Sequence, residues 1–379
     1  MRIGVATETA EHEARVALAP ISAARFVRAG IDVLVESGAG ARAFFDDAAY
    51  RDAGAQIAPD AAAVYADADI LLKVAAPSPA EIESLRAGQV LIAVLQPLTS
   101  PELVSALAER GVTAFSLDAI PRIARAQPMD VLSSQASLAG YKAAVMAADT
   151  LGKHLPMMTT AAGTMPPARG LVLGAGVAGL QAIATGRRLG AVMSAFDVRP
   201  AVKEQVQSLG ATFIEDEELQ RAQTETAGGY AREQTADERA RAQELVHRHV
   251  GASDFVITTA LVPGRPAPRL VTREMVEDMQ PGSVIIDLAA ETGGNCELTA
   301  PGETIVHQGV IINGPINVPS SMPVHASLMF SRNAQSFLDL LIRDGEIVLD
   351  RDDEILRDSL ITHGGEVTHA AAREAIGAA

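Results

Sequence analysis

The sequence predicts an α/β protein built from two parallel-sheet domains, with the second domain inserted into a discontinuous first domain. Short apolar runs typical of strands alternate with runs typical of helices, and this alternation occurs twice along the 379 residues. That length suits two domains better than one. The composition agrees, because 48% of the residues are hydrophobic but only 3% are aromatic, and cores of Ala, Val, Leu and Ile are typical of buried parallel sheets.

The first series of elements accounts for the N-terminal part of the chain. Its helical runs carry Pro at or near their start and Gly at their end, which is the expected asymmetry of helix boundaries. Strands and helices in alternation imply a parallel sheet covered on both faces. The expected strands are 3–8, 31–38, 70–75, 90–95 and 112–118, and the expected helices are 21–30, 79–88 and 101–111.

Two long helical runs, 138–153 and 322–345, flank the second series. We expect the later run to return the chain to the first domain, which makes that domain discontinuous. The predicted domains are residues 1–137 plus 319–379, and residues 138–318. The expected strands of the second domain are 169–176, 191–197, 211–215, 254–260, 283–289 and 309–314.

The polar segment 216–243 is long for a connection between two strands of a compact sheet. Two glycines, Gly228 and Gly229, precede an isolated Tyr230 near its centre. The pattern fits a flexible lid and an exposed, partly helical insertion equally well.

Charge and cysteine content exclude several classes of protein. The formal charge of −16 argues against nucleic acid or an anionic membrane as a direct partner. The single cysteine, Cys296, rules out an internal disulfide and a zinc site made of cysteines. The first twenty residues lack the apolar core of a signal peptide, and the chain lacks an apolar run of about 18 residues. We therefore expect no direct membrane insertion, and we expect no metal site.

A glycine-rich turn provides the most specific motif in the sequence. Gly174, Gly176 and Gly179 follow a strand-like run and open a helix-like run, and Asp197 ends the next strand 23 residues after the first glycine. This context is the fingerprint of a Rossmann domain that binds a dinucleotide. Asp197 would accept hydrogen bonds from the adenosine ribose and repel a 2′-phosphate, which favours NAD(H) over NADP(H). Arg199 keeps the alternative open, because a nearby arginine can accommodate a phosphate.

The stretch "RIARAQPMDVLSSQ" at 122–135 gathers two guanidiniums, amides, a carboxylate and hydroxyls. It contains no obvious nucleophile and no set of metal ligands. On pattern alone it fits a polar hinge between domains that is stabilised by an Arg–Asp pair. It also fits a site that holds a reacting group without moving protons.

Several stretches together resemble a known family. They are "AAGTMPPARGLVLGAGVAGLQAIATGRRLGA", "ETAGGYARE", "ITTALVPGRPAP", "PGSVIIDLAAETGGN" and "RIARAQPMDVLSSQASLAGY". They look like the NAD(H)-binding α1 subunit, or domain I, of proton-translocating NAD(P) transhydrogenase, a relative of alanine dehydrogenase. The resemblance covers essentially the whole chain.

The resemblance implies a Re/Si-specific NAD(P)⁺ transhydrogenase that needs partner subunits for activity. Hydride would pass directly between NAD(H), bound here in the interdomain cleft, and NADP(H) on a partner beta subunit. Membrane subunits would couple this transfer to proton translocation. The chain would form a homodimer in the cytoplasm, peripheral on the inner face of the bacterial plasma membrane.

The resemblance also implies roles for particular residues. Arg122 and Ser133 would hold the nicotinamide end, Gln127 would reach the incoming NADP(H) domain, and Asp130 would order the arginine and its loop. Pro128 stands where a small polar residue is expected and should stiffen the loop. Tyr230 would belong to a mobile loop that closes over the nucleotide. The implied nucleotide contacts are Gly174, Gly176, Val177, Ala178, Gly179, Asp197, Val198, Arg199, Gly229, Tyr230, Gln243 and Leu261.

An alanine dehydrogenase is the first alternative, because that pattern shares an arginine with this chain at Arg15. Its lysine position is Ala75 here, its histidine position is Gln96 and its aspartate position is Glu291. Such an enzyme must move protons, so Lys73 or Glu291 would have to replace the missing groups. A second alternative is a non-catalytic NAD-binding protein that senses redox state.

Overall fold

A computed structural model describes residues 1–215, 235–262 and 264–378. The chain divides into two compact units. Unit 1 comprises Met1–Gln135 and Pro319–Ala379, and unit 2 comprises Ala136–Val318. Both contain a large, mostly parallel sheet, which confirms the predicted fold class.

Unit 1 is built around an eight-stranded sheet in the order β19-β18-β6-β5-β4-β1-β2-β3. The first six strands along the chain pair in parallel, whereas β18 runs antiparallel to β6. The C-terminal segment thus completes the sheet that the N-terminal segment begins. The strands are β1 Arg2–Val5, β2 Asp32–Glu36, β3 Gln56–Ala58, β4 Ile70–Leu72, β5 Val90–Ala93, β6 Thr113–Ser116, β18 Leu360–His363 and β19 Glu366–Val367.

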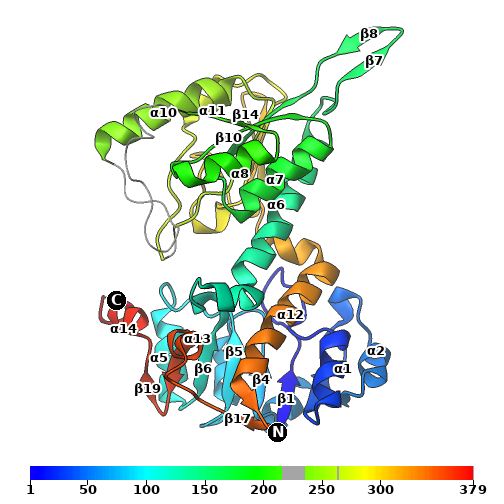
Figure 1. Ribbon diagram of the computed structural model, residues 1–379, viewed down its shortest axis with the longest axis vertical. Helices are drawn as coiled ribbons and strands as arrows, with labels where there is room; N and C mark the ends of the chain where they lie inside the picture. Colours follow the sequence, from blue (N-terminus) through cyan, green and yellow to red (C-terminus); the bar gives the residue numbers. More distant parts are fainter. Residues whose placement is uncertain (216–234, 263, 379) are drawn as a thin grey trace. The chain divides into compact units, whose positions relative to one another are not determined.

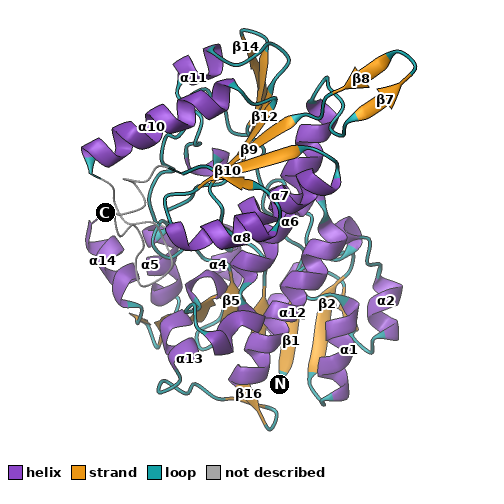
Figure 2. Ribbon diagram, turned by 45° about the horizontal axis from the view of Figure 1, so that its top comes forward, coloured by secondary structure: helices purple, strands orange, loops and turns teal. Residues whose placement is uncertain are grey.

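Alternation along the strands gives unit 1 two hydrophobic layers, one on each face of the sheet. In β4, Ile70 and Leu72 belong to one core while Leu71 belongs to the other, because successive strand side chains point to opposite faces. Helices cover both layers (Figure 2). The helices are α1 Pro20–Arg28, α2 Asp47–Asp52, α3 Ala61–Asp67, α4 Pro79–Ser84, α5 Pro101–Glu109, α12 Pro323–Leu341, α13 Glu354–Ser359 and α14 Ala370–Ala378. A short hairpin of β16 Ile342–Arg343 and β17 Glu346–Ile347 follows α12.

Unit 2 contains a seven-stranded sheet in the order β11-β10-β9-β12-β13-β15-β14. All its strands pair in parallel except β14, which is antiparallel to β15. Chain order reverses between β9 and β12, so this is the switch point at which open α/β sheets bind ligands. The strands are β9 Arg169–Leu173, β10 Val192–Phe196, β11 Thr212–Phe213, β12 Phe255–Thr258, β13 Val284–Asp287, β14 Thr304–His307 and β15 Val310–Asn313.

Helices also cover both faces of the unit 2 sheet. The helices are α6 Val131–Thr150, which starts in unit 1, α7 Val177–Arg188, α8 Lys203–Ser208, α10 Ala236–Gly251 and α11 Arg273–Glu277. Buried side chains of α6, α7 and α8 form one core with the sheet, and those of α10 and α11 form the other. A hairpin of β7 Met158–Thr160 and β8 Gly163–Met165 extends away from the rest of this unit (Figure 1).

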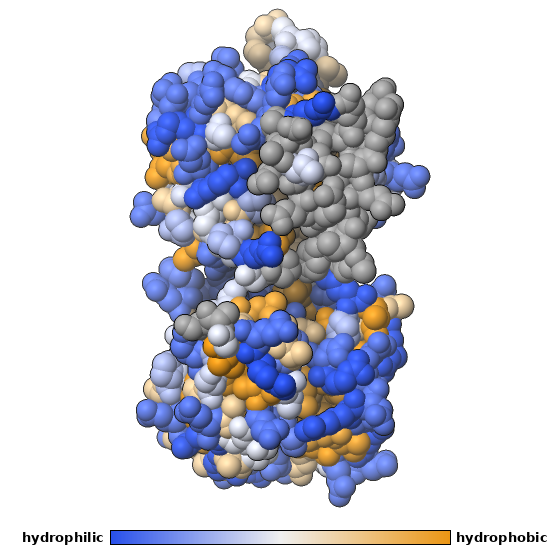
Figure 3. Space-filling model, turned by 90° about the vertical axis from the view of Figure 1, so that its left-hand side faces the viewer, coloured by the Kyte–Doolittle hydropathy of each residue, from blue (hydrophilic) through white to orange (hydrophobic). Residues whose placement is uncertain are grey.

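The structure contains elements that the sequence reasoning missed. Helix α6 begins at Val131 rather than near residue 138, so Ser133 lies in its first turn. β3, α2, α3, the hairpin β7–β8 and the C-terminal strands β18 and β19 were also not anticipated. Hydrophilic residues dominate the face drawn in Figure 3, with smaller hydrophobic areas between them, as expected for a strongly charged chain.

Candidate dinucleotide site

The glycine turn between β9 and α7 has a geometry that only glycine satisfies. Gly174 has φ +97°, a region that favours glycine. A Cβ added at Gly179 would lie 1.9 Å from the carbonyl oxygen of Gly174. At Gly176 the nearest atom to an added Cβ is a guanidinium nitrogen of Arg199, 3.8 Å away. The first and third glycines therefore allow close packing within the turn, and the second leaves open space beside the backbone.

The start of α7 is suited to bind an anion. Gly176 is its N-cap, and no described side chain caps it. The first backbone N–H groups of a helix lack intrahelical partners and carry the positive end of the helix dipole. Val177 and Ala178 follow the N-cap directly, and the Val177 side chain is 44% exposed. These features fit the pyrophosphate of a dinucleotide.

Asp197, just beyond the end of β10, accepts four hydrogen bonds from described residues. Its Oδ2 accepts the Ala175 N–H at 2.7 Å and a guanidinium N–H of Arg199 at 2.9 Å. Its Oδ1 accepts the backbone N–H of Arg199 at 2.8 Å and Nε–H at 3.0 Å. A carboxylate has about four acceptor positions. Ribose hydroxyls can therefore bind Asp197 only if Arg199 gives up part of this pairing.

Three of the other predicted nucleotide contacts, Leu261, Gln243 and Val198, lie among the described residues. Leu261 follows β12 and is 52% exposed, and Gln243 is exposed on α10. Val198 is half-buried between Asp197 and Arg199. Gly229 and Tyr230 lie outside the described residues.

The polar stretch of unit 1 forms a 3₁₀ helix, Ala124–Met129, followed directly by α6. Asp130 lies at the junction. Its carboxylate accepts the backbone N–H of Ser133 at 2.8 Å and the Ser133 hydroxyl at 2.6 Å, so it caps α6 as an N-cap residue does. Arg122 and Gln127 are exposed. Asp130 and Ser133 are thus brought together, with Gln127 on the 3₁₀ helix and Arg122 just before it.

Two contacts from the C-terminal segment hold this 3₁₀ helix. Arg125 makes two hydrogen bonds to Asp353, at 2.7 and 3.0 Å, and this pairing lowers the pKa of Asp353. The Asn333 side chain on α12 donates to the carbonyl oxygen of Pro128 at 2.7 Å. Pro128 lies inside the 3₁₀ helix, where its ring restricts the backbone. Sequence reasoning assigned no role to Arg125 or Asn333, because their partners are about 200 residues distant in the chain.

Two family models match the chain. The model "Alanine dehydrogenase/PNT, N-terminal domain" matches residues 4–139, and "Alanine dehydrogenase/PNT, C-terminal domain" matches residues 143–370. The chain belongs to the alanine dehydrogenase/PNT family. The resemblance predicted from the quoted stretches is confirmed.

Relatives within the alanine dehydrogenase/PNT family favour its transhydrogenase branch. The chain is 47% identical to an NAD(P) transhydrogenase alpha subunit of Rhodospirillum rubrum over 98% of each chain. It is 31% identical to alanine dehydrogenase of Mycobacterium tuberculosis over 96% of this chain and 94% of that one. The crystal structure of transhydrogenase from Sinorhizobium meliloti aligns with a TM-score of 0.88 at 46% identity, covering 97% of this chain and all of that one. These likenesses support a transhydrogenase component.

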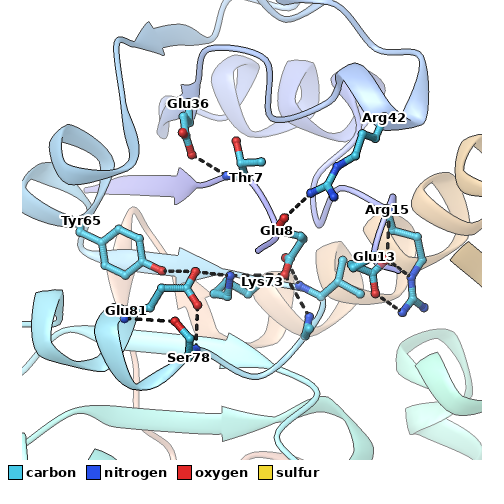
Figure 4. Close-up of polar contacts among 12 residues, drawn as sticks. Thr7, Glu8, Glu13, Arg15, Glu36, Arg42, Tyr65, Lys73, Ser78 and Glu81 are labelled. Carbon is cyan, nitrogen blue, oxygen red and sulfur yellow. Dashed lines mark hydrogen bonds and ion pairs between the residues drawn. The ribbon is translucent and has the colours of Figure 1, made fainter. Parts of the chain in front are cut away.

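Lys73, which would have to replace the missing lysine of an alanine dehydrogenase, is engaged in a buried charged cluster in unit 1 (Figure 4). Lys73 is 1% exposed. Its ammonium lies 2.8 Å from Glu81 Oε1 and 3.3 Å from Glu8 Oε2. Burial lowers the pKa of Lys73, but the two carboxylates outweigh burial and raise it overall. Lys73 is therefore held as a cation between two anions and is unsuited to accept a proton.

Each carboxylate of this cluster has further donors. Glu8 accepts the backbone N–H groups of Val74 and Ala75 at 2.6 and 3.3 Å, and burial nevertheless raises its pKa. Glu81 accepts the Tyr65 hydroxyl at 3.1 Å and the Ser78 N–H at 2.7 Å. Burial raises the pKa of Glu81, but Lys73 and the Ser78 hydrogen bonds lower it overall. The cluster has the character of a structural ion network.

At the remaining positions of the alanine dehydrogenase pattern, Arg15 is engaged in an ion pair, whereas Gln96 and Glu291 are exposed. The Arg15 guanidinium makes two hydrogen bonds to Glu13, at 2.6 and 2.8 Å, and one to Gln135 at 2.9 Å. Gln96 is exposed with φ +50°, and Glu291 is exposed.

Burial raises the pKa of the Cys296 thiol to about 11, so it stays protonated and is a poor nucleophile.

Neither a metal-binding cluster nor a membrane-spanning helix is found within the described ranges. Among residues 1–215, 235–262 and 264–378, no group of three His, Cys, Asp or Glu side chains is placed to hold a metal ion. In the same part of the chain, no helix combines the length and the apolar character needed to cross a bilayer.

Proposed function

We propose that this chain is the NAD(H)-binding component of a proton-translocating transhydrogenase. It would pass hydride directly between NAD(H) bound here and NADP(H) bound on a partner subunit, with Re/Si specificity. The observation that carries the proposal is the glycine turn, where Gly176 leaves the backbone open at an uncapped helix start. The likeness to transhydrogenase alpha subunits over almost the whole chain supports the same function.

When bound, NADH supplies the hydride, and the residues of this chain hold it. The backbone N–H groups of Val177 and Ala178 bind the pyrophosphate, beside Gly174, Gly176 and Gly179. Asp197 binds the adenosine ribose and favours NAD(H) over NADP(H), and Arg199 lies beside it as a further contact. Further nucleotide contacts come from Val198, Gly229, Tyr230, Gln243 and Leu261.

The 122–133 stretch acts at the reacting end. Arg122 and Ser133 bind the nicotinamide carboxamide and fix the ring face, and Gln127 reaches the NADP(H) subunit. Asp130 keeps Ser133 in place through its two hydrogen bonds. Direct hydride transfer requires positioned rings and exclusion of water rather than a proton relay. The engagement of Lys73 and Arg15 in ion pairs supports this chemistry over deamination of an amino acid.

The proposal includes an assembly. The chain forms a homodimer, meets an NADP(H)-binding beta subunit, and lies in the cytoplasm on the inner face of the bacterial plasma membrane. Separate membrane subunits translocate the protons. This chain alone should bind NADH and transfer almost no hydride.

A hydride-transfer assay tests the proposal. NADH and a coloured NADP⁺ analogue are mixed with this chain, with and without an NADP(H)-binding transhydrogenase subunit. Fast transfer only with the partner is expected, and Arg122→Ala or Gln127→Asn should slow it. Arg357→Ala, which removes an exposed arginine of α13, is the matched control and should leave the rate unchanged.

The same preparation separates the alternatives. Turnover of NAD⁺ with L-alanine would establish an alanine dehydrogenase. Tight NADH binding without any transfer, even with the partner present, would instead favour a redox sensor. Either result would contradict the transhydrogenase proposal.

A further inference from the structure

The switch point of the unit 2 sheet divides a dinucleotide into two halves. Asp197 follows β10 on one side of β9, and the segment 259–262 follows β12 on the other side. In a doubly wound sheet each half binds one mononucleotide. Because Asp197 serves the adenosine half, the 259–262 segment underlies the nicotinamide half. The contacts that fix the 259–262 segment therefore influence the position of the nicotinamide, which is the reacting end of the nucleotide.

The buried side chain of Asn295 holds this segment through Ala260. Its Oδ1 accepts the backbone N–H of Ala260 at 2.9 Å, and its Nδ2 donates to the Ala260 carbonyl oxygen at 2.9 Å. The same amide donates to the Pro268 carbonyl oxygen at 2.8 Å. Asn295 is 0% exposed. It thus pairs with Ala260 as a neighbouring strand would, and it also joins Ala260 to Pro268.

The clamped segment is joined to the glycine turn. The Thr259 hydroxyl donates to the Gly174 carbonyl oxygen at 2.9 Å, and its backbone N–H donates to Leu173 at 2.9 Å. A Cβ added at Gly174 would lie 2.8 Å from the Thr259 hydroxyl oxygen. The glycine turn, which faces the pyrophosphate, and the 259–262 segment are therefore in direct contact.

The opposite side of Asn295 is anchored to the sheet. Asp287, the last residue of β13, is 0% exposed and accepts the Cys296 N–H at 2.9 Å and the Thr299 hydroxyl at 2.6 Å. The residue next to Asn295 is thus fixed by a buried carboxylate. The contacts to Ala260 and Pro268 use one acceptor and two donors on the same side chain, which the carboxamide of Asn295 supplies.

We propose that Asn295 is a positioning residue that holds the 259–262 segment under the nicotinamide half of NAD(H). The inference rests on the proposed function, since it presupposes that unit 2 binds this nucleotide. Asn295 should govern affinity for NADH much more than affinity for ADP, which lacks the nicotinamide half.

Equilibrium binding of NADH and of ADP to the full chain tests this assignment. Asn295→Ala should raise the Kd for NADH about tenfold, with the Kd for ADP unchanged within about twofold. Asn295→Asp, which keeps the volume but loses the donors, should act in the same direction. Thr259→Val removes the hydroxyl contact to Gly174 while keeping the shape, and should weaken NADH binding less than Asn295→Ala.

Val250→Ala is the control for lost stability. Val250 is fully buried under the same sheet at the end of α10, and its truncation should leave both Kd values unchanged. Equal weakening of NADH and ADP, or wild-type NADH binding in all three loop variants, would overturn the assignment. If the wild-type chain failed to bind NADH at all, the proposed function itself would be wrong.

Discussion

At the scale of single residues, the pairing of Asp197 with Arg199 is the feature most closely linked to nucleotide choice. An unpaired aspartate at this position would strongly repel a 2′-phosphate. Here Arg199 contacts both carboxylate oxygens, so the negative charge is partly compensated. A bidentate guanidinium–carboxylate pair is strong and oriented. We therefore expect selectivity between NAD(H) and NADP(H) to depend on both Asp197 and Arg199.

Arg199→Ala should therefore increase discrimination against NADP(H). Without the guanidinium, Asp197 presents a fuller charge to a 2′-phosphate, so the ratio of the Kd for NADPH to that for NADH should rise at least about fivefold. Fluorescence titration with both nucleotides measures it. Asp197→Asn should lower the same ratio. A ratio that fell in Arg199→Ala would show that Arg199 binds the phosphate.

Lys73 is a residue whose loss should cost much stability, because its cation lies between two carboxylates. Lys73→Met leaves the buried Glu8 and the partly buried Glu81 without their cation, which should lower the free energy of unfolding by about 3–5 kcal/mol near neutral pH. In the variant both carboxylates should have native pKa values above their unfolded values. The loss is then fully present above those pKa values and shrinks as pH falls and the carboxylates become protonated.

Urea unfolding at about pH 7.5 and about pH 5 checks both parts of the Lys73 prediction. Lys153→Met provides the control, because Lys153 is half-exposed in its pair with Asp254 and should contribute less than about 1 kcal/mol. Equal losses for the two variants, or a loss in Lys73→Met that grows on acidification, would contradict the account.

At the scale of elements, the sequence predicted strands and helices where local signals agree. The core strands β9, β12 and β13 are short apolar runs bounded by polar residues or glycine, and each was located. The strand β3 was missed, because only one of its three residues is buried and its apolar pattern is too short. The start of α6 was missed because several residues of its first turns are polar and give no helical apolar pattern. In the structure this start is stabilised by capping from Asp130.

Helix α7 gives the sharpest element-level prediction. Gly179→Ala should abolish measurable NADH binding, because a Cβ there would lie 1.9 Å from the Gly174 carbonyl oxygen and displace the glycine turn. Gly152→Ala is the matched control, since an added Cβ meets nothing within 4 Å. Calorimetric titration of both variants decides the point. NADH binding by Gly179→Ala at wild-type affinity would contradict the assigned geometry.

The contact between α12 and the 3₁₀ helix leads to a kinetic prediction. Asn333→Ala removes the donor to the Pro128 carbonyl oxygen and should misplace Gln127. Partner-dependent hydride transfer should slow about 10- to 100-fold, while the Kd for NADH changes little. Ser336→Ala, on the exposed side of the same helix, should leave the rate unchanged. A parallel loss of NADH affinity in Asn333→Ala would instead indicate general damage to the fold.

At the scale of the whole molecule, the residues that we propose to bind the nucleotide come from two different units. The 122–133 stretch is in unit 1, and the glycine turn, Asp197 and Leu261 are in unit 2. The glycine turn could be predicted because its glycines lie close together in the sequence and each position has a physical reason to be glycine. Asn295, Arg125 and Asn333 could not, because their partners become neighbours only through the fold.

The central claim is that hydride passes directly from NADH to NADP⁺ without exchanging with water. The most direct test uses NADH deuterated at the transferred position of C4, incubated with this chain, the NADP(H)-binding subunit and NADP⁺. Mass spectrometry of the product NADPH measures the label. Essentially complete deuterium retention is predicted, since no acid or base takes part in the transfer. NADPH that carries hydrogen from the solvent would contradict direct transfer and require a proton-handling group at the site.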